Sequence, residues 1–314
     1  MSLRDFSKRR NRILFWMPLG GLGDVFIQRM LFWDVKRVYP EAEIHFAVLD
    51  NYRDVVSDHP MLSGVHSART VELSDFMMHY KTCIYVANKY ENAHGLSCAL
   101  NRSDIWGLYC GIELQRHDMQ FSLDASLLRE CRQELDAMKS VSGAPTVLFA
   151  PVSAVRTKTL LPDQISEVVE ATRCANLVGS HSRAVKELDS AGVPGVYGCN
   201  LRKWMHFIAA ADYVISVDSA AFHVAGGLRK PLVGIFTFAN GKTYGKHYDF
   251  VLVQRHFDDG DWECGPCYDY KSCIRTRDDL KPCLTTLTEG RISGAVRQMF
   301  ERWPVSGRLA LKTL

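Results

Sequence analysis

The sequence predicts an α/β protein with two domains, each built on a parallel sheet that helices cover on both faces. Strand patterns alternate with helix patterns along the chain, in two successive series. The length of 314 residues is about twice that of a typical domain of roughly 150 residues. A small, polar, turn-rich segment at 140–145, SVSGAP, separates the two series. We therefore expect one domain at 1–143 and a second at 144–314, facing each other across a cleft.

The first series begins with a strand at 12–17, followed directly by a glycine-rich turn at 20–23. An amphipathic helix at 24–38 ends before Pro40. Further elements are listed in chain order: strands at 43–49 and 81–87, then helices at 104–110 and 125–138.

The second series starts with the apolar strand at 146–150, and a helix with proline at its first position follows at 162–172. The remaining strands are expected at 176–179, 195–197, 213–216 and 232–235, and the helices at 183–190, 202–211, 219–227 and 287–303. Both series are Rossmann-like, and ligands of such sheets bind at the carboxyl ends of the strands.

The composition is that of an ordinary globular chain, with 47% hydrophobic and 23% charged residues. No apolar run reaches the roughly 18 residues that cross a bilayer, and the amino terminus lacks a signal-peptide pattern. We expect a cytoplasmic protein. The net charge of +3 does not require a nucleic-acid partner. A basic cluster at 8–12 is either a solvated tail or a contact with anionic membrane surface or a phosphorylated acceptor.

The first candidate site is the turn Gly20–Asp24, in which Gly21 and Gly23 allow the backbone to approach a ligand closely. A dinucleotide site is the rival interpretation, with Asp50 as its ribose-binding acid. Phe26 stands where a third small residue is expected, and this argues against a dinucleotide. Asp24 is either a plain helix cap or a catalytic carboxylate, and the two roles are compatible.

The second candidate site is the loop 151–162, directly after the first strand of the second series. Ser153 and Arg156 provide donors there, and Lys158 is a point charge suited to a phosphate. The other interpretation is that both cations are simply solvated.

The third candidate site opens the helix at 219–227. Asp218 and Ser219 are capping types, Ala220 is small, and His223 lies one turn further on the same face. A helix that begins at the carboxyl end of a buried strand presents backbone N–H groups and a positive dipole to an anion. An ordinary capped helix with a structural histidine remains the alternative.

Ten cysteines are present, and four of them cluster in the segment 264–283. The spacing Cys264-x2-Cys267-x5-Cys273-x9-Cys283 predicts a structural tetrathiolate site for zinc or iron. Disulfides or free thiols are the alternatives. Just before it, Asp259-Gly260-Asp261 is either a metal–diphosphate signature or, as we prefer, a solvated turn.

These sites together resemble glycosyltransferase family 9, the heptosyltransferase-like enzymes of the GT-B fold. The resemblance is carried by RILFWMPLGGLGDVFIQ, by the P-x(6)-K-x(3)-P loop around Lys158, and by YGCNLRKWMHFIAAADYVISVDSAAFHVAGGLRKPLVGIF. It extends over residues 12–300. Family members show D-[ST]-G-x-x-H-x-A-x-x-x-x-K/R-P in the last segment. This chain departs from the family at Ala220, where glycine is usual, and at 159–162, where Trp–Pro is replaced.

The resemblance implies transfer of a sugar from a nucleotide-diphosphate donor, typically ADP-heptose, with inversion at the anomeric carbon. Asp24 matches the family's acidic motif and is the expected base. Lys158 and the helix start at Ser219–Ala220 would neutralise the leaving diphosphate. Asp218 would hold the donor sugar or order the turn, and His223 would orient the turn or touch phosphate.

The implied transfer needs no metal, and a metal held by four thiolates has no open position, so the cysteine segment would be structural only. The expected acceptor is a glycan, such as lipopolysaccharide core or another lipid-linked acceptor, reached at the inner face of the membrane. Two alternatives stay open. One is a transferase that acts on a protein or a hydroxylated DNA base, and the other is a nucleotide-sugar-binding module without catalysis.

Overall fold

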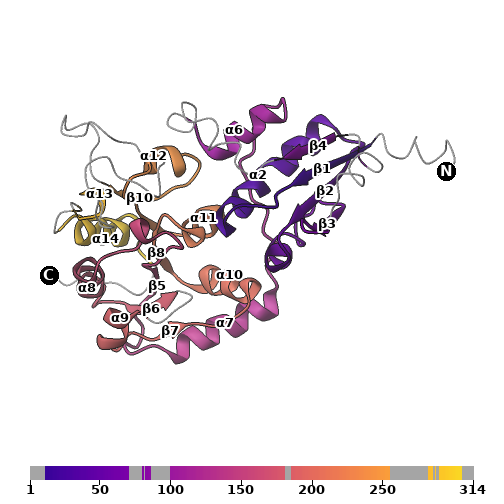
Figure 1. The fold of residues 1–314 in the computed structure, drawn as a ribbon. Coiled ribbons are helices and arrows are strands. Elements are labelled where there is room, and N and C mark those ends of the chain that lie inside the picture. The colour runs from indigo at the N-terminus through magenta and orange to yellow at the C-terminus, as the bar shows by residue number, and fades with distance from the viewer. Residues whose placement is uncertain are drawn as a thin grey trace, which may run out of the picture. The chain divides into compact units, whose positions relative to one another are not determined.

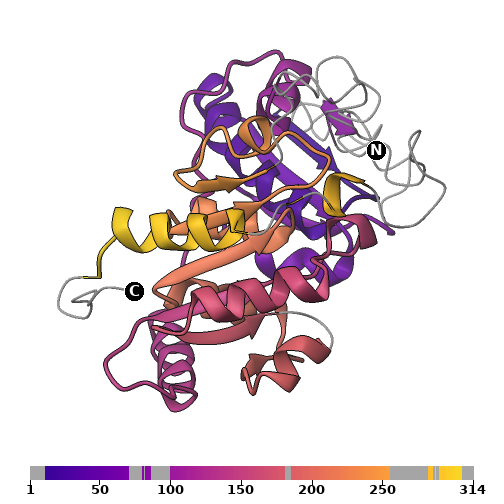
Figure 2. The ribbon, with the colours of Figure 1, turned by 90° about the vertical axis from the view of Figure 1, so that its left-hand side faces the viewer.

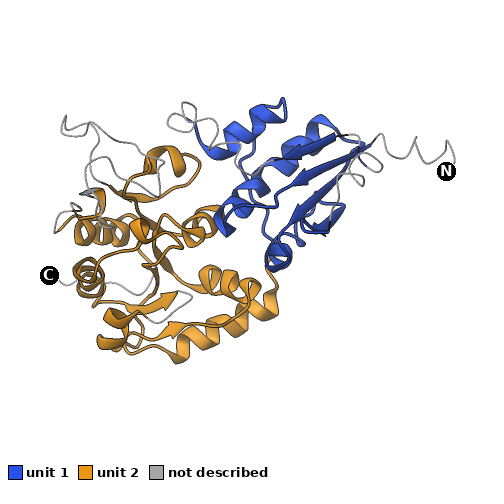
Figure 3. Ribbon diagram, viewed as in Figure 1, with its two compact units in different colours: residues 1–122 blue, residues 123–314 orange. Residues whose placement is uncertain are grey.

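The chain divides into two compact units, Met1–Ser122 and Leu123–Leu314 (Figure 3). The computed structural model describes residues 11–70, 80, 82–85, 100–180, 185–254, 282–285, 287 and 290–305. Each unit carries its own parallel sheet (Figure 1), as the alternating pattern predicted. Among the helices of these ranges, none is both long and apolar enough to cross a membrane.

The sheet of the first unit has the strand order β3-β2-β1-β4. Its strands are β1 (Arg12–Trp16), β2 (Glu43–Val48), β3 (Gly64–Ser67) and β4 (Thr82–Tyr85), and its helices are α2 (Leu22–Val38), the 3-10 helix η1 (Asp50–Val55) and α6 (Arg102–Tyr109). Phe32 of α2 packs edge-on against Phe15 of β1 and Phe46 of β2, with ring centroids 5.2 Å apart in both pairs. Since successive strand residues alternate between faces, the neighbours Leu14 and Ala47 lie on the face away from α2.

The sheet of the second unit has the strand order β10-β9-β8-β5-β6-β7. Its strands are β5 (Thr146–Ala150), β6 (Asn176–Ser180), β7 (Gly195–Val196), β8 (Tyr213–Val217), β9 (Leu232–Ile235) and β10 (Val251–Val253). Read from β7, this is the 3-2-1-4-5-6 order of the dinucleotide-binding fold. The order reverses between β5 and β8, and ligands of such sheets bind outside the carboxyl ends of the strands at that point.

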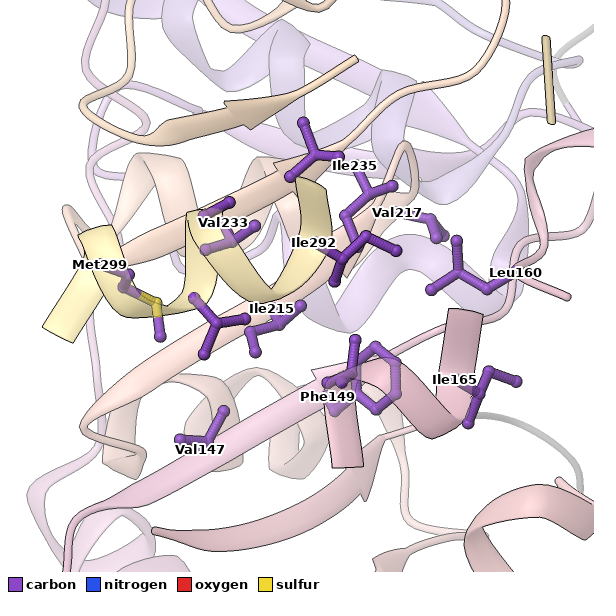
Figure 4. Close-up of a cluster of buried hydrophobic side chains, with 14 of the residues drawn as sticks. Val147, Phe149, Leu160, Ile165, Ile215, Val217, Val233, Ile235, Ile292 and Met299 are labelled. Atoms are coloured by element: carbon purple, nitrogen blue, oxygen red, sulfur yellow. The ribbon is translucent and has the colours of Figure 1, made fainter. Parts of the chain in front are cut away.

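Helices cover both faces of this second sheet. They are α7 (Ala125–Ala137), the 3-10 helix η2 (Arg156–Lys158), α8 (Pro162–Ala171), α9 (Lys186–Ser190), α10 (Leu201–Ala210), α11 (Ala220–Gly227), α12 (Gly241–Tyr244), α13 (Pro282–Thr285) and α14 (Arg291–Arg302). Figure 2 shows α14, in yellow, alongside the orange strands of the sheet. Its Ile292 and Met299 join an apolar cluster with Ile215 and Val233 of the strands (Figure 4). On the other face Gly234 lies against α11, where an added Cβ would come within 2.5 Å of the Phe222 ring.

The boundary between the units lies at 122/123 and so differs from the predicted boundary at 143/144. The reason is that α7 packs on α10 of the second unit. Lys203 of α10 binds Glu130 and Glu134 of α7, each at 2.7 Å. The expected linker is also held by this unit, because Asn176 Oδ1 accepts hydrogen bonds from the N–H groups of residues 140 and 141 at 2.9 and 2.8 Å.

Candidate functional site

The strongest candidate site lies in the second unit, where the loop after β5 meets the end of β8. Lys158 Nζ lies 2.7 Å from Asp218 Oδ2, and the two side chains are only 10% and 7% exposed. These residues follow the two strands between which the strand order reverses. The structure therefore brings a buried cation and its carboxylate to the place where a doubly wound sheet binds its ligand.

The loop that carries Lys158 is ordered by its own hydrogen bonds. Thr159 Oγ1 accepts from Ser153 N at 3.1 Å and donates to Ser153 O at 3.3 Å. The N–H of Leu160 donates to Pro151 O at 3.0 Å and closes the loop. Lys158 Nζ also lies 5.5 Å from the ring centroid of Phe238, within the range of a cation–π contact. Arg156, in contrast, is exposed.

The start of α11 lies at the same edge of the sheet. Ser219 is the N-cap residue, but its side chain makes no capping hydrogen bond. Its Oγ lies 3.1 Å from Ser216 Oγ, and the Ser216 hydroxyl donates to Val217 O at 2.8 Å. The single hydroxyl proton of Ser216 is thus in use, so Ser219 is the donor of that pair. The first turn of α11 has no cap from Ser219, which suits a helix start that receives an anion.

Ala220 and His223 both lie within α11. Ala220 is the first residue of α11 and is not among the residues with positive φ, so its backbone does not require the glycine of the family pattern. His223 is 2% exposed, and its Nδ1 lies 3.2 Å from the hydroxyl of Tyr248. Its ring also contacts Phe222 edge-on, with centroids 5.3 Å apart. These contacts fix the orientation of the imidazole ring within the second unit.

The glycine turn of the first unit positions Asp24. Gly20 has φ +131°, a backbone that side chains rarely adopt, whereas Gly21 is the N-cap of α2 and Gly23 lies in its first turn. Asp24 Oδ2 accepts a hydrogen bond from Gly21 N at 2.9 Å. Asp24 is thus the third residue of α2 and not its N-cap as expected, and its side chain caps the helix start by accepting from the N-cap residue Gly21.

Arg102 is a site residue that the sequence analysis missed. Its Nη1 donates to Asp24 Oδ1, and the two side chains are 9% and 16% exposed. Arg102 begins α6, 78 positions from Asp24, so no local spacing pairs them. Nearby on α6, Asp104 Oδ1 lies 2.9 Å from His117 Nε2.

Of the predicted cysteine ligands, Cys264, Cys267 and Cys273 lie outside the described residues, as does the Asp259–Asp261 string. Cys283 is described and is buried in α13, with 4% exposure.

The parallel sheets, the strand order and the buried cation at its reversal define an α/β protein of the nucleotide-binding, GT-B type. The family model for glycosyltransferase family 9 (heptosyltransferase) matches residues 99–256, just over half of the chain. The protein therefore belongs to glycosyltransferase family 9, and it is a glycosyltransferase. The resemblance and the fold class predicted from the sequence are both confirmed.

Solved structures of low sequence identity share the fold. The iron-containing dodecameric glycosyltransferase TibC from enterotoxigenic E. coli H10407 is 15% identical, with a TM-score of 0.70, over 92% of this chain and 78% of that chain. TibC in complex with ADP-D-beta-D-heptose is 13% identical, with a TM-score of 0.66, over 94% of this chain and 77% of that chain. The ADP-heptose LPS heptosyltransferase II of E. coli is 14% identical, with a TM-score of 0.62, over 93% and 99%. A search of curated protein sequences found no match.

Proposed function

We propose that the protein transfers a heptose or similar sugar from a nucleotide-diphosphate donor, ADP-heptose first, to a hydroxyl group of a glycan acceptor. The observation that carries this proposal is the Lys158–Asp218 pair at the reversal of strand order, beside the start of α11. Membership of glycosyltransferase family 9 supports the reaction class. The ligands named for TibC and for heptosyltransferase II support ADP-heptose as the donor.

The donor half of the reaction falls to the second unit. The leaving nucleoside diphosphate gains negative charge as its bond to the anomeric carbon breaks, so a nearby fixed cation lowers the barrier. Lys158 supplies this cation, with the backbone N–H groups at the start of α11. Asp218 holds Lys158 in place in the absence of donor and releases part of that interaction when phosphate arrives. Ser153 and Arg156, on the same loop, add donors for the diphosphate.

The acceptor half falls to Asp24 as the general base. The acceptor oxygen bonds to the anomeric carbon from the face opposite the diphosphate, which inverts the configuration, and its proton passes to the carboxylate. A carboxylate has about four lone-pair positions. Gly21 N–H and Arg102 occupy two of these in the structure, so capacity for the proton remains. Arg102 also fixes the direction of the carboxylate.

The test combines transfer and donor binding in two variants. Lys158→Ala is expected to lower kcat by about 10²–10³-fold, the effect typical of losing one leaving-group donor, and to weaken ADP binding measured by calorimetry. Asp24→Ala is expected to lower kcat by about 10²–10⁴-fold with donor binding retained, because a base acts on the acceptor.

Asp124→Ala is the matched control. Asp124 also caps a helix, α7, by accepting from two backbone N–H groups, but it has no place in the proposed chemistry. This variant is expected to keep full transfer activity with about 1 kcal/mol less stability. Turnover by Asp24→Ala equal to that of Asp124→Ala would overturn the base assignment.

The acceptor proposed first is lipopolysaccharide core or another lipid-linked glycan, met in the cytoplasm at the inner face of the membrane. The word "lps" in the name of heptosyltransferase II supports this choice. Assays with glycan, protein and hydroxymethylated DNA acceptors distinguish it from the other acceptor classes, and transfer only to protein or DNA would replace it.

We also propose a structural iron or zinc ion held by Cys264, Cys267, Cys273 and Cys283. Their spacing and the iron-containing TibC support this assignment. Four thiolates leave no open coordination position, so the ion would take no part in sugar transfer.

A further inference from the structure

We propose that the first unit carries a second metal site, in which His45, His66 and Tyr80 bind a divalent transition-metal ion such as Zn²⁺. His45 Nδ1 and His66 Nε2 lie 2.8 Å apart. The hydroxyl of Tyr80 lies 3.3 Å from the first of these nitrogens and 3.5 Å from the second. Two imidazole nitrogens, which transition metals prefer, and a phenol oxygen therefore converge on one point. None of them belongs to the proposed transfer machinery.

The strand register brings the two imidazoles together. In the parallel β2–β3 pair His45 lies opposite Gly64, and Ala47 lies opposite His66. Residues two apart on a strand share a face, so both histidines project from the same side of the sheet, the side away from α2. Their rings are stacked, with centroids 5.1 Å apart and planes at 6°.

Gly64 provides the space for this convergence. A Cβ at this position would lie 3.0 Å from His45 Nδ1 and 3.1 Å from His66 Nε2. It would fill the space directly beside the two nitrogens. Tyr80 closes the group from the same face, where it packs against Leu14, Ala47 and Ala68.

The spacing of the three atoms is close to that of a tetrahedral zinc site. With metal–nitrogen distances of about 2.0–2.1 Å, two ligands of a tetrahedral ion lie about 3.3 Å apart. The two distances to Tyr80 match this value, and the two nitrogens need to separate by only about half an ångström. An entering ion would replace their shared proton.

The surroundings of His45 complete the pattern of a ligating histidine. Its Nε2 is buried and makes no hydrogen bond within the part of the chain that the structure describes, yet it lies 3.7 Å from Glu43 Oε2. A ligating histidine usually directs its other N–H to a carboxylate in this way. Arg12 holds that carboxylate at 2.6 Å.

Burial favours the neutral form of both rings, which is the form that binds metals. Burial is the largest cause that lowers the pKa of His45, with added repulsion from His66 and Arg12 and an opposing effect of Glu43. Burial likewise lowers the pKa of His66, and Arg53 and Arg12 add to the effect.

The test is titration of the full-length protein with Co²⁺ and Zn²⁺ alone. Cobalt distinguishes the two proposed sites, because thiolate ligands give an intense near-ultraviolet charge-transfer band that nitrogen and oxygen ligands lack. We expect one equivalent of Co²⁺ that gives visible d–d bands without the sulfur band. His45→Gln and His66→Gln should lose this equivalent, and Glu43→Gln should weaken it by about tenfold.

His206→Gln is the control, since it removes a buried histidine of the second unit and should leave the equivalent in place. Zn²⁺ should raise the Tm of the wild type more than that of His66→Gln. Tyr80→Phe serves if the histidine variants do not fold, and it should bind more weakly than the wild type. Unchanged binding in His66→Gln and Tyr80→Phe, an equal loss in His206→Gln, or cobalt bound by sulfur alone would overturn the proposal.

Discussion

His59 is a buried histidine that the fold keeps neutral. Its Nε2 donates to Arg29 O at 3.1 Å, and its Nδ1 accepts from Met61 N at 3.2 Å, which leaves no place for a second ring proton. Burial, with added repulsion from the Arg29 guanidinium, lowers the pKa of His59 from 6.5 to about 3.

This pKa shift predicts a loss of stability in mild acid. Between pH 6.5 and pH 3 the unfolded chain protonates His59 and the folded chain does not, so the free energy of unfolding falls as the pH falls through this range. The contribution of His59 is full above pH 6.5 and is reduced by about 2 kcal/mol at pH 5. Urea unfolding at pH 7, 6 and 5 measures this loss.

His59→Gln separates this contribution from those of other groups. The variant will be less stable at every pH, but its stability should change less between pH 7 and pH 5 than that of the wild type. Because the pKa values of His45 and His66 are also lowered, the free energy of unfolding of the variant should still fall to a smaller extent as the pH falls. Equal slopes in the two proteins would show that His59 is not the titrating group.

At the scale of elements, the fully buried guanidinium of Arg29 joins three segments of the first unit. From α2 it donates to Val55 O at 2.8 Å and to both oxygens of Asp58 at 2.6 and 3.0 Å. It also donates to the carbonyls of Met119 and Gln120, each at 2.8 Å. All five N–H donors of the side chain are thereby used.

Replacing Arg29 by Met should destabilise the first unit strongly. The change removes five hydrogen bonds and leaves the Asp58 carboxylate without its cation, and breaking a buried pair typically lowers the unfolding free energy by about 3–5 kcal/mol. Arg173→Ala is the control, because its bridge to Glu170 is 76% and 62% exposed and should contribute less than about 1 kcal/mol. Denaturant unfolding compares the two, and similar losses would contradict the assignment.

The sequence predicts the elements whose patterns are local and misses those that depend on distant partners. The strands 12–16, 146–150 and 232–235 are apolar runs, and helix 125–137 is amphipathic; each was expected within a residue or two. Strands β3 and β10 and helix α12 were missed, since they have only three or four residues each. The two strands form because they pair with β2 and β9, and a short window of sequence does not include those partner strands.

In the candidate site, too, the sequence predicted features that depend on local pattern and missed contacts between distant residues. Lys158 and Asp218 were each predicted as ligand-binding residues, because each follows an apolar strand. Their mutual ion pair was not predicted, since it depends on β5 and β8 being neighbours. The Arg102–Asp24 pair and the His45–His66 pair were missed for the same physical reason.

At the scale of the whole molecule, the proposed cysteine-bound ion makes a prediction about metal content. Purified protein should contain close to one iron or zinc per chain by elemental analysis. Cys264→Ser should lose this ion and lower the Tm, because a structural metal contributes folding free energy directly. Cys174→Ser, outside the 264–283 segment, should retain it. Equal metal content in the two variants would contradict the assignment.

The packing of α7 on α10 has a consequence for recombining this enzyme with its relatives. Asp124 caps α7, and its backbone N–H is bound by His206 of α10 at 3.0 Å. A chimaera that exchanges the first unit should therefore be joined ahead of Asp124. A junction at 143 would import a foreign α7 and set it against a surface shaped for Cys131 and Leu135, which are buried in the native protein. The segment that reads as a linker is thus a poor crossover point, and 122/123 is the better junction for a chimaera that tests whether the first unit sets acceptor specificity.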